Sequence, residues 1–408
     1  MKHFRHIVSV LVILLITVLA VGTIVERLHG SDFARSHVYG TWWFVALWAA
    51  FLVVGAIMTF RNQNWKRPVV LTLYLSVACI LVGALLTMLT GQHGRMKLEP
   101  NRPNSHFFIQ DHGEITKKAL PFSLTLDRFE IETYSGSSKP KDYVSYLRLS
   151  EGETYRDVVI SMNHILKYKH YRFYQSDYDQ QGNSILDVAR DPWGIGVTYV
   201  GYALLFVALA AILFSRFASL TNVESSDLRG GTTKQSTNRI VTFSWVTVLV
   251  VLMVLLYIRM LTHTLMPVLR SPLFSIHIST IVTAYALLLS ILVVGVIALF
   301  QPKNLARMER LKNISTAMLY PAVALLAAGI FIGAVWANIS WGNYWSWDPK
   351  EVWALITLLI YTLPLFPNVL RSFHKPLFFH IYGIIAFLSV VITYFGVNLI
   401  LGGVHAYN

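Results

Sequence analysis

Charged residues are scarce in this sequence. Only 13% of its 408 residues are Asp, Glu, Lys or Arg, whereas 55% are hydrophobic and the mean hydropathy is +0.53. A water-soluble domain needs a polar coat around its core, and a composition this apolar does not supply one. The shortage of charge therefore excludes an ordinary soluble protein and indicates a membrane protein with several spans.

Cysteine is almost absent as well. Cys79 is the only one, and it lies within an apolar stretch. A single cysteine cannot form an internal disulfide, which excludes a disulfide-stabilised scaffold. The sequence contains no Cys-x-x-Cys and no Cys-x-x-Cys-His. These absences argue against thiol exchange by this chain and exclude a c-type cytochrome.

Acidic residues are the scarcer charged class, with 21 Asp and Glu against 34 Lys and Arg and a net charge of +13. The basic residues gather in short loops between apolar segments, where they orient the spans of a membrane protein. The charge is therefore explained without a nucleic-acid partner. We expect contact with membrane lipid and none with nucleic acid.

Long apolar segments are abundant. A helix needs about 20 apolar residues to cross a bilayer, and nine segments are long enough. The first follows Lys2 and Arg5 and lacks a small-residue cleavage pattern, so we expect a retained anchor. The predicted spans are residues 7–26, 41–60, 69–90, 194–214, 240–262, 274–299, 317–337, 351–366 and 376–402.

The distribution of Lys and Arg predicts which side each loop occupies. If the N-terminus is inside, the inner loops carry most of the basic residues, Arg61, Lys303 and Arg371 among them. The polar segment 91–193 then lies outside. Ser, Thr and Gly are concentrated in residues 218–239, which we interpret as an inner linker between two halves of the chain.

The outer segment alternates between apolar and polar residues in the manner of β-strands. Residues 122–126 and 143–149 show this alternation, and residues 134–140 form a predicted turn between them. Further strands are predicted at residues 158–160, 171–174 and 184–188. The predicted fold is an α-helical polytopic membrane protein of about nine spans with one extracytoplasmic, mainly β domain.

Tryptophans cluster between the seventh and eighth predicted spans. Trp341, Trp345 and Trp347 lie within seven residues, beside Tyr344. Interfacial anchoring accounts for one or two tryptophans but not for this density. Packed indoles make a flat apolar shelf suited to a large planar ring. Asp348 follows, in a position where an ordinary helix N-cap is at least as good an explanation as a functional role.

Two histidines lie near the outer ends of predicted spans. His277 lies at the start of the sixth span, and His405 lies just beyond the ninth. A single histidine at such a position is more often an interfacial hydrogen-bonding residue. A pair flanking a tryptophan shelf on one face favours axial ligation of a haem iron. His380, early in the ninth span, is at the wrong depth and is interpreted as interhelix packing.

A second histidine pair points to a different class of protein. His263 and His277 are fourteen residues apart, a spacing with which b-type membrane cytochromes hold haem on one helix. Pro267 and Pro272 lie between them, and proline interrupts a helix. A b-type cytochrome is therefore the less favoured alternative.

At the tryptophan segment the sequence resembles the system II cytochrome c biogenesis proteins, whose motif has the form WGxxWxWDxxE. The match comprises Trp341, Gly342, Trp345, Trp347, Asp348 and Glu351. His277 and His405 match the external histidines of the family. Residues 22–26 and 38–44 and the outer β domain resemble the partner subunit more loosely, so the chain looks like a fusion of both components.

The resemblance implies an activity of the holocytochrome c synthase type in a bacterial inner (plasma) membrane. Haem b is then both substrate and bound ligand, held extracytoplasmically on Trp341, Trp345, Trp347 and Asp348, with His277 and His405 as axial ligands. The implied partners are apocytochrome c, which receives haem through thioethers at Cys-x-x-Cys-His, and thiol-reducing proteins of the pathway. No catalytic nucleophile is implied.

The resemblance also implies a division of the chain. Residues 1–90 are the three-span partner-like region, residues 91–193 the β domain, residues 194–239 the fourth span and linker, and residues 240–408 the five-span haem-handling domain. One position departs from the family, because Phe366 stands where a span histidine is expected. The outer haem site is therefore better supported than a route across the membrane, and a haem exporter or chaperone without synthase activity is the alternative.

Overall fold

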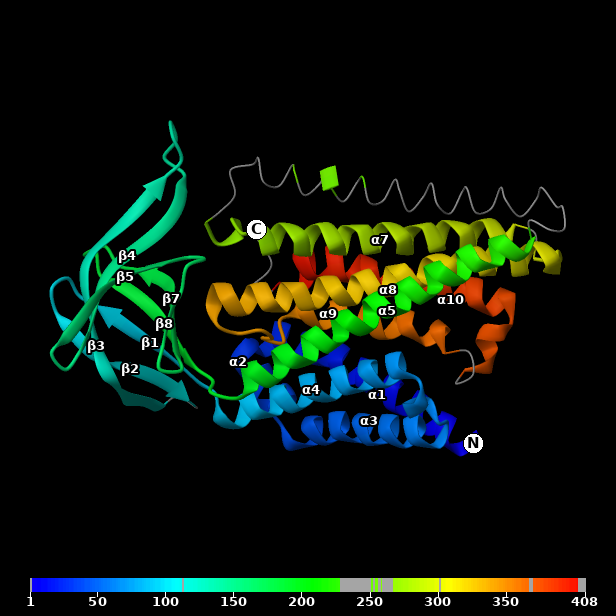
Figure 1. Cartoon of the computed structure of the whole chain (residues 1–408), viewed down its shortest axis with the longest axis horizontal. Helices are drawn as coiled ribbons and strands as arrows, with labels where there is room; N and C mark the ends of the chain where they lie inside the picture. Colours follow the sequence, from blue (N-terminus) through cyan, green and yellow to red (C-terminus); the bar gives the residue numbers. More distant parts are fainter. Residues whose placement is uncertain are drawn as a thin grey trace.

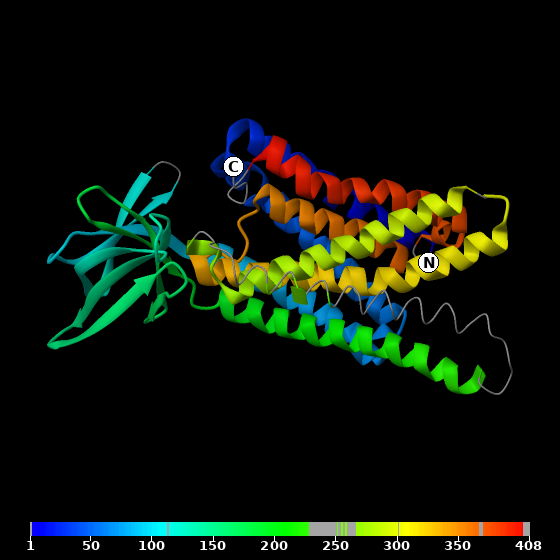
Figure 2. The same ribbon diagram turned by 90° about the horizontal axis from the view of Figure 1, so that it is seen from above.

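The computed structural model describes residues 2–111, 114–227, 267–300, 302–366 and 370–402, together with residues 251, 254, 255 and 258. A bundle of long helices forms one part, and a β domain lies at one end of it (Figure 1). The N-terminus lies at the opposite end of the bundle from the β domain. In the view from above, the helices again run side by side away from the sheet (Figure 2).

Most described helices begin or end with recognisable signals. Pro68, Pro272, Pro349 and Pro376 each stand at the first position of a helix, where proline's missing N–H is not needed. The α-helices are α1 (Lys2–His29), α2 (Ser31–Ala34), α3 (Trp42–Arg61), α4 (Pro68–Thr90), α5 (Gly194–Asp227), α7 (Pro272–Leu299), α8 (Leu305–Trp341), α9 (Pro349–Thr362) and α10 (Pro376–Val391). The π-helical segments are η1 (Arg35–Tyr39) and η6 (Ile392–Leu401), which extends α10, and the 3-10 segments are η2 (Asn64–Lys66), η3 (Pro267–Leu269), η4 (Leu363–Leu365) and η5 (Arg371–His374).

Seven of the described helices are long and apolar enough to cross a membrane, which makes this a multi-pass membrane protein. They correspond to seven predicted spans. The predicted span 351–366 becomes α9, which has 14 residues and continues as η4, with Pro364 inside the turn. A 14-residue helix is about 21 Å long, short of a hydrocarbon core of about 30 Å. The predicted span 240–262 lies almost entirely outside the described residues, so the count of nine is not confirmed.

The β domain is a single antiparallel sheet of eight strands in the order β5-β4-β3-β2-β1-β8-β7-β6. Its strands are β1 (Gln92–Leu98), β2 (Pro103–Asp111), β3 (Glu114–Thr133), β4 (Pro140–Glu151), β5 (Thr154–Ser161), β6 (Leu166–Tyr168), β7 (Tyr171–Tyr178) and β8 (Ser184–Arg190). Side chains from all eight strands meet in one buried cluster, in which Met96, Leu124 and Phe173 are fully buried. The sheet therefore curls around its own core, and β5 contacts β6 and β7.

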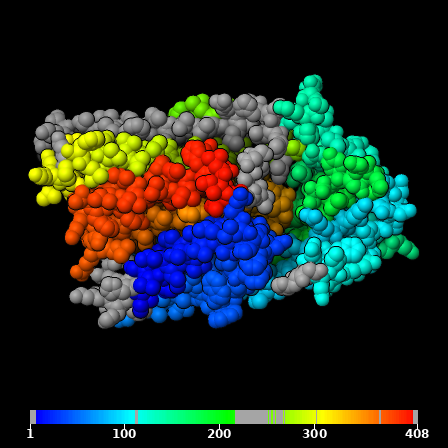
Figure 3. All heavy atoms as spheres, turned by 180° about the vertical axis from the view of Figure 1, so that it is seen from behind, coloured from blue at the N-terminus to red at the C-terminus, as the bar shows by residue number. Residues whose placement is uncertain are grey.

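The two halves of the chain share one helical bundle. Helix α1 packs against α9, and α5 packs against α8. The N-terminal helices lie beside the C-terminal ones on the face seen from behind (Figure 3). Helix α4 leads into β1, and β8 leads into α5. The β domain is therefore joined to the bundle through both the first and the last of its strands in the sequence.

Candidate functional site

The tryptophan segment is a short loop between α8 and α9 at the β-domain end of the bundle. Helix α8 ends at Gly342, whose φ of 87° is left-handed. A side chain there would also meet Tyr174 of β7, since an added Cβ would lie 2.8 Å from that ring. Glycine at this position thus both ends the helix and lets the loop approach the sheet.

The far side of the loop is fixed by the start of α9. Asp348 is the N-cap residue and is 2% exposed, and its Oδ1 accepts a hydrogen bond from the Lys350 backbone N–H at 2.9 Å. Oε2 of Glu351 accepts one from the Ser346 backbone N–H at 2.8 Å. An acidic N-cap and an acidic residue in the first turn both favour the helix start. Asp348 therefore caps α9, as one of its two interpretations predicted.

Trp345 and Trp347 pack together, and Trp347 reaches the first half of the chain. Their rings meet edge to face at 5.8 Å between centroids. Trp347 stacks on Tyr39 at 4.8 Å and meets the edge of Phe44 at 5.0 Å. Its φ of 61° is left-handed, a conformation that costs about 1–3 kcal/mol for a non-glycine residue and persists only where the surroundings impose it.

Trp341 belongs to a different aromatic group. Its indole meets the edge of Trp336 at 4.8 Å, and Trp336 lies 4.7 Å from Phe274 on α7. Within the described residues, the tryptophans of the motif thus form two groups on either side of the loop. The buried Nε1 atoms of Trp336 and Trp345 have no hydrogen-bond acceptor among the described residues. An unpaired buried N–H is costly, by about 1–3 kcal/mol, which makes both indoles candidates for contact with a ligand.

His277 lies near the start of α7 and is oriented by α8. Its Nδ1 lies 2.7 Å from the carbonyl oxygen of Gly329. A carbonyl oxygen only accepts hydrogen bonds, so Nδ1 carries the proton, and in the neutral ring Nε2 carries the lone pair. Such an orienting hydrogen bond is the usual support of a metal-ligating histidine. Phe274, 6.4 Å from the His277 ring, connects it to the Trp336 and Trp341 group.

Gly333 on α8 makes room for the His277 ring. A Cβ at this position would lie 2.6 Å from both Cε1 and Nδ1 of His277, a distance at which something must move. We expect Gly333→Ala to turn the ring away from Gly329 and to lower haem occupancy of the purified protein about tenfold. Gly196→Ala on α5 is the control, because its Cβ would meet nothing within 4 Å. Equal haem spectra in the two variants would argue against a role of His277 in haem binding.

The other predicted histidines are placed unequally. His405 and His263 lie outside the described residues. Asn398, seven residues before His405, accepts a hydrogen bond from Nζ of Lys350 at 2.9 Å, so the last turns of η6 lie beside the motif. Residues 267–271, between His263 and His277, are a 3-10 turn and two non-helical residues, so no single α-helix joins the two histidines.

Two further residues considered in the sequence lie away from the motif. His380 is buried, and its ring nitrogen Nε2 lies 3.2 Å from the Met308 carbonyl oxygen, which is an interhelix contact. Phe366 is 55% exposed and follows η4, beyond the end of α9 that is remote from the motif.

Several residues that tie the motif to the first half and to the β domain were not predicted. The Tyr344 hydroxyl donates to Thr87 Oγ1 at 2.8 Å, and Thr87 donates to Asp191 at 2.5 Å. Trp353 Nε1 donates to Thr23 Oγ1 at 3.2 Å. Thr23, Tyr39 and Phe44 all lie in the two N-terminal stretches that resemble the partner subunit, which was the signal available in the sequence.

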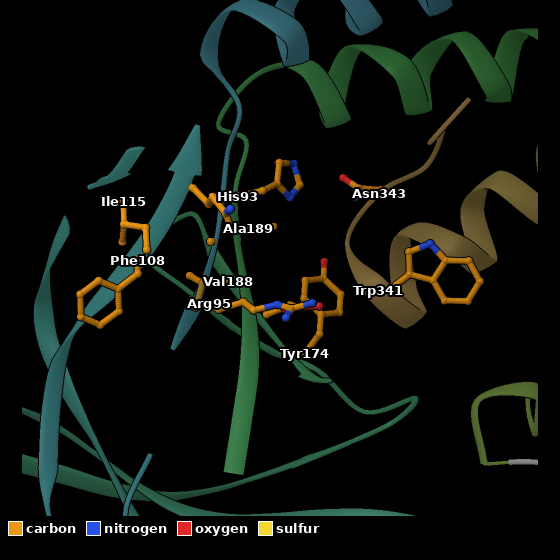
Figure 4. A pocket seen from close by; sticks show the side chains of 12 residues that line it. His93, Arg95, Phe108, Ile115, Tyr174, Val188, Ala189, Trp341 and Asn343 are labelled. Carbon is orange, nitrogen blue, oxygen red and sulfur yellow. The ribbon is translucent and has the colours of Figure 1, made fainter. Parts of the chain in front are cut away.

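A cavity of about 290 Å³ separates the motif from the β domain (Figure 4). Trp341 and Asn343 line it from the motif side. His93, Arg95 and Tyr174 line it from the sheet. The cavity therefore lies between the two parts of the molecule, at the end of the bundle where α7 begins.

Comparison with known proteins matches both parts of the chain. Residues 200–405, half of the sequence, match the model of the cytochrome c assembly protein family, and residues 61–189 match the ResB-like family. Protein NrfI of Wolinella succinogenes is 38% identical over 151 residues, which cover 35% of this chain and 17% of that protein.

Two further relatives are named cytochrome c biogenesis protein CcsA. The one from Microcystis aeruginosa is 44% identical over 112 residues, covering 27% of this chain and 33% of the relative. The one from Chlamydomonas reinhardtii is 37% identical over 153 residues, covering 35% and 42%. The chain thus spans less than half the length of these curated relatives.

Proposed function

The chain belongs to the cytochrome c assembly protein family and joins it to a ResB-like region, as a fusion of the system II type, and we propose that it attaches haem covalently to c-type cytochromes. In this proposal the substrates are haem b and an apocytochrome with a reduced Cys-x-x-Cys-His segment. Each thiol adds across a vinyl group of the haem to form a thioether. The sulfur bonds to one vinyl carbon and the thiol hydrogen to the other, so no further reactant is consumed.

The geometry of His277 is the observation that carries this proposal. Its Nδ1–H is directed to the Gly329 carbonyl at 2.7 Å, which presents Nε2 as the ligand nitrogen. We assign His277 as one axial ligand and His405 as the other. In this proposal Trp341, Trp345, Trp347 and Asp348 line the porphyrin site. The buried indole N–H groups of Trp336 and Trp345 have no acceptor among the described residues and are available to a ligand there. The chain chiefly positions the reactants, an effect that in the best cases lowers a barrier by about 7–11 kcal/mol.

The arrangement of the bundle supports a site where haem and the acceptor polypeptide meet on one side of the membrane. The β domain, the tryptophan loop and the start of α7 lie at one end of the bundle, opposite the N-terminus (Figure 1). We propose that this end is extracytoplasmic in a bacterial plasma membrane, because the basic residues gather in loops of the other end. In this arrangement residues 1–90 act as the membrane anchor and residues 91–193 as the outer domain. Residues 194–239 act as the linker and residues 240–408 as the haem-handling domain. Thiol-reducing proteins are the expected source of reduced cysteines.

A maturation assay tests the proposed function. The chain is produced together with a tagged apocytochrome in a host that lacks its own maturation genes, and covalent haem on the tagged protein is stained after denaturing electrophoresis. We expect a stained band with the intact acceptor and none when both acceptor cysteines are replaced by serine. Haem in the membrane fraction without a stained acceptor would instead support an exporter or chaperone.

A further inference from the structure

The cavity beneath the β domain is lined by residues of five strands of the sheet, β1, β2, β3, β7 and β8, and by the motif. About 290 Å³ in volume, it is lined by His93 and Arg95 of β1, Asp187 of β8, and Trp341 and Asn343 of the motif (Figure 4). Trp341 also borders the aromatic group that leads to His277. The cavity is therefore the described space that adjoins both the outer domain and the candidate haem site.

The alternation of β1 directs His93 into this space. Met96 is fully buried in the sheet's own core, so the odd-numbered side chains of β1 point to the opposite face. His93 lies opposite Ala189, and Arg95 lies opposite Asp187, with their side chains 3.3 Å apart at the nearest charged atoms. All four belong to the face of the sheet that is turned toward the motif.

The surroundings of His93 keep its imidazole neutral. His93 is an exposed residue of β1 whose side chain lines the cavity, and protein atoms lie close to it on its other sides. Burial lowers the pKa of His93 below its ordinary value, and the positive charge of Arg35 acts in the same direction. The carboxylates of Asp191 and Asp187 act in the opposite direction and do not outweigh burial. The two cations of the same strand are both paired, Arg95 with Asp187 and Lys97 with Asp179.

We propose that this cavity receives the cysteine-bearing segment of the acceptor polypeptide and that His93 accepts the thiol proton during thioether formation. The inference rests on the proposed function. The thiol proton moves to the unprotonated ring nitrogen of His93, and the sulfur bonds to the inner vinyl carbon. His93 then returns a proton to the outer vinyl carbon. The net change is addition of S–H across the double bond, and His93 ends as it began.

The chemistry needs a proton acceptor, and the cavity offers a suitable one. A cysteine thiol has a pKa near 8.5, so only a few per cent is thiolate at neutral pH. A neutral imidazole within reach of the thiol supplies the reactive form without a rise in pH. The amide of Asn343 and the indole of Trp341 offer a polar and an apolar contact to a peptide whose middle residues vary.

The test measures haem attachment against pH with the full chain. Purified haem-loaded protein is reduced with dithionite and mixed with a synthetic peptide containing Cys-x-x-Cys-His, and the rate is followed by the mass of the peptide–haem adduct. We expect His93→Asn to lower the rate at pH 7 by about 100-fold or more, the lower range for loss of a general base. The deficit should shrink toward pH 9, because the thiol then ionises by itself.

Matched variants separate proton transfer from structure. His106→Asn changes a histidine of the neighbouring strand β2 that does not line the cavity, and it should react like wild type. His93→Gln provides a second side chain without basicity and should behave like His93→Asn, with the haem spectrum unchanged in both. A deficit that is the same at pH 7 and pH 9, or wild-type rates in both His93 variants, overturns the inference. If wild type itself forms no adduct, the proposed synthase function is what fails.

Discussion

Replacing His277 by alanine should remove most of the haem from the purified protein and abolish covalent haem on a co-produced acceptor. Ligand loss should exceed the 10- to 100-fold effect typical of losing a residue that merely supports a ligand. The physical reason is the geometry at Gly329, which holds the ring with its Nε2 presented as a ligand. The measurement is the haem-to-protein ratio and absorption spectrum of detergent-solubilised protein.

Added imidazole makes this prediction specific for ligation. A free imidazole molecule can occupy the position that His277→Ala vacates, so it should restore part of the six-coordinate spectrum and part of the maturation. His380→Ala is the matched control, since His380 is also a buried histidine of the bundle but bonds the Met308 carbonyl. It should lower stability without a change in the spectrum. If His277→Ala retains the wild-type spectrum, the ligand assignment is wrong.

Trp341→Ala and Trp347→Ala should fail in different ways. Trp341 lines the cavity, so its loss should leave protein levels near normal while maturation falls at least about tenfold. Trp347 stacks on Tyr39 and contacts Phe44, which joins the two halves. Aromatic pairs contribute about 0.5–1.5 kcal/mol beyond the area they bury, and a loss of 1–2 kcal/mol changes abundance several-fold. Trp347→Ala should therefore lower both protein level and maturation.

Conservative variants make the contrast between these two tryptophans measurable. Trp347→Phe keeps a ring against Tyr39 and should recover most of the protein level. Membrane-fraction immunoblots against the tagged chain give the level, and stained acceptor per unit of chain gives the activity. Normal maturation per unit of chain in both alanine variants would reduce the motif to an interfacial anchor and an interhelix contact.

The sequence was informative about elements whose pattern is strong on its own. Long apolar runs predicted the seven described spanning helices, and alternation predicted strands such as β4 and β7. Strand β1 was missed because its seven residues include only two large apolar ones, Met96 and Leu98, among polar and charged neighbours. His93 and Arg95 of this strand line the cavity. The polar residues that hid the strand from the alternation pattern are thus the ones able to take part in chemistry.

The site could be predicted in its residues but not in its partners. The tryptophan density and the position of His277 are local signals. The pairing of Trp347 with Tyr39 joins residues 308 positions apart in the sequence, and the Tyr344–Thr87 hydrogen bond joins residues 257 apart. Such contacts depend on how the two halves pack, which no single-sequence pattern encodes. The predicted span 351–366 corresponds to α9 and η4 together, and its α-helical part ends before Pro364 because proline does not continue a helix.

The mass of the acceptor polypeptide after co-production with this chain tests the central claim most directly. The account predicts a tagged apocytochrome heavier by one haem, with both cysteines of its Cys-x-x-Cys-His segment resistant to alkylation. Gly333→Ala and His277→Ala should each reduce this species. An acceptor of unmodified mass with two alkylatable cysteines, recovered beside a chain that is itself loaded with haem, would contradict the synthase function and leave a protein that carries haem without attaching it.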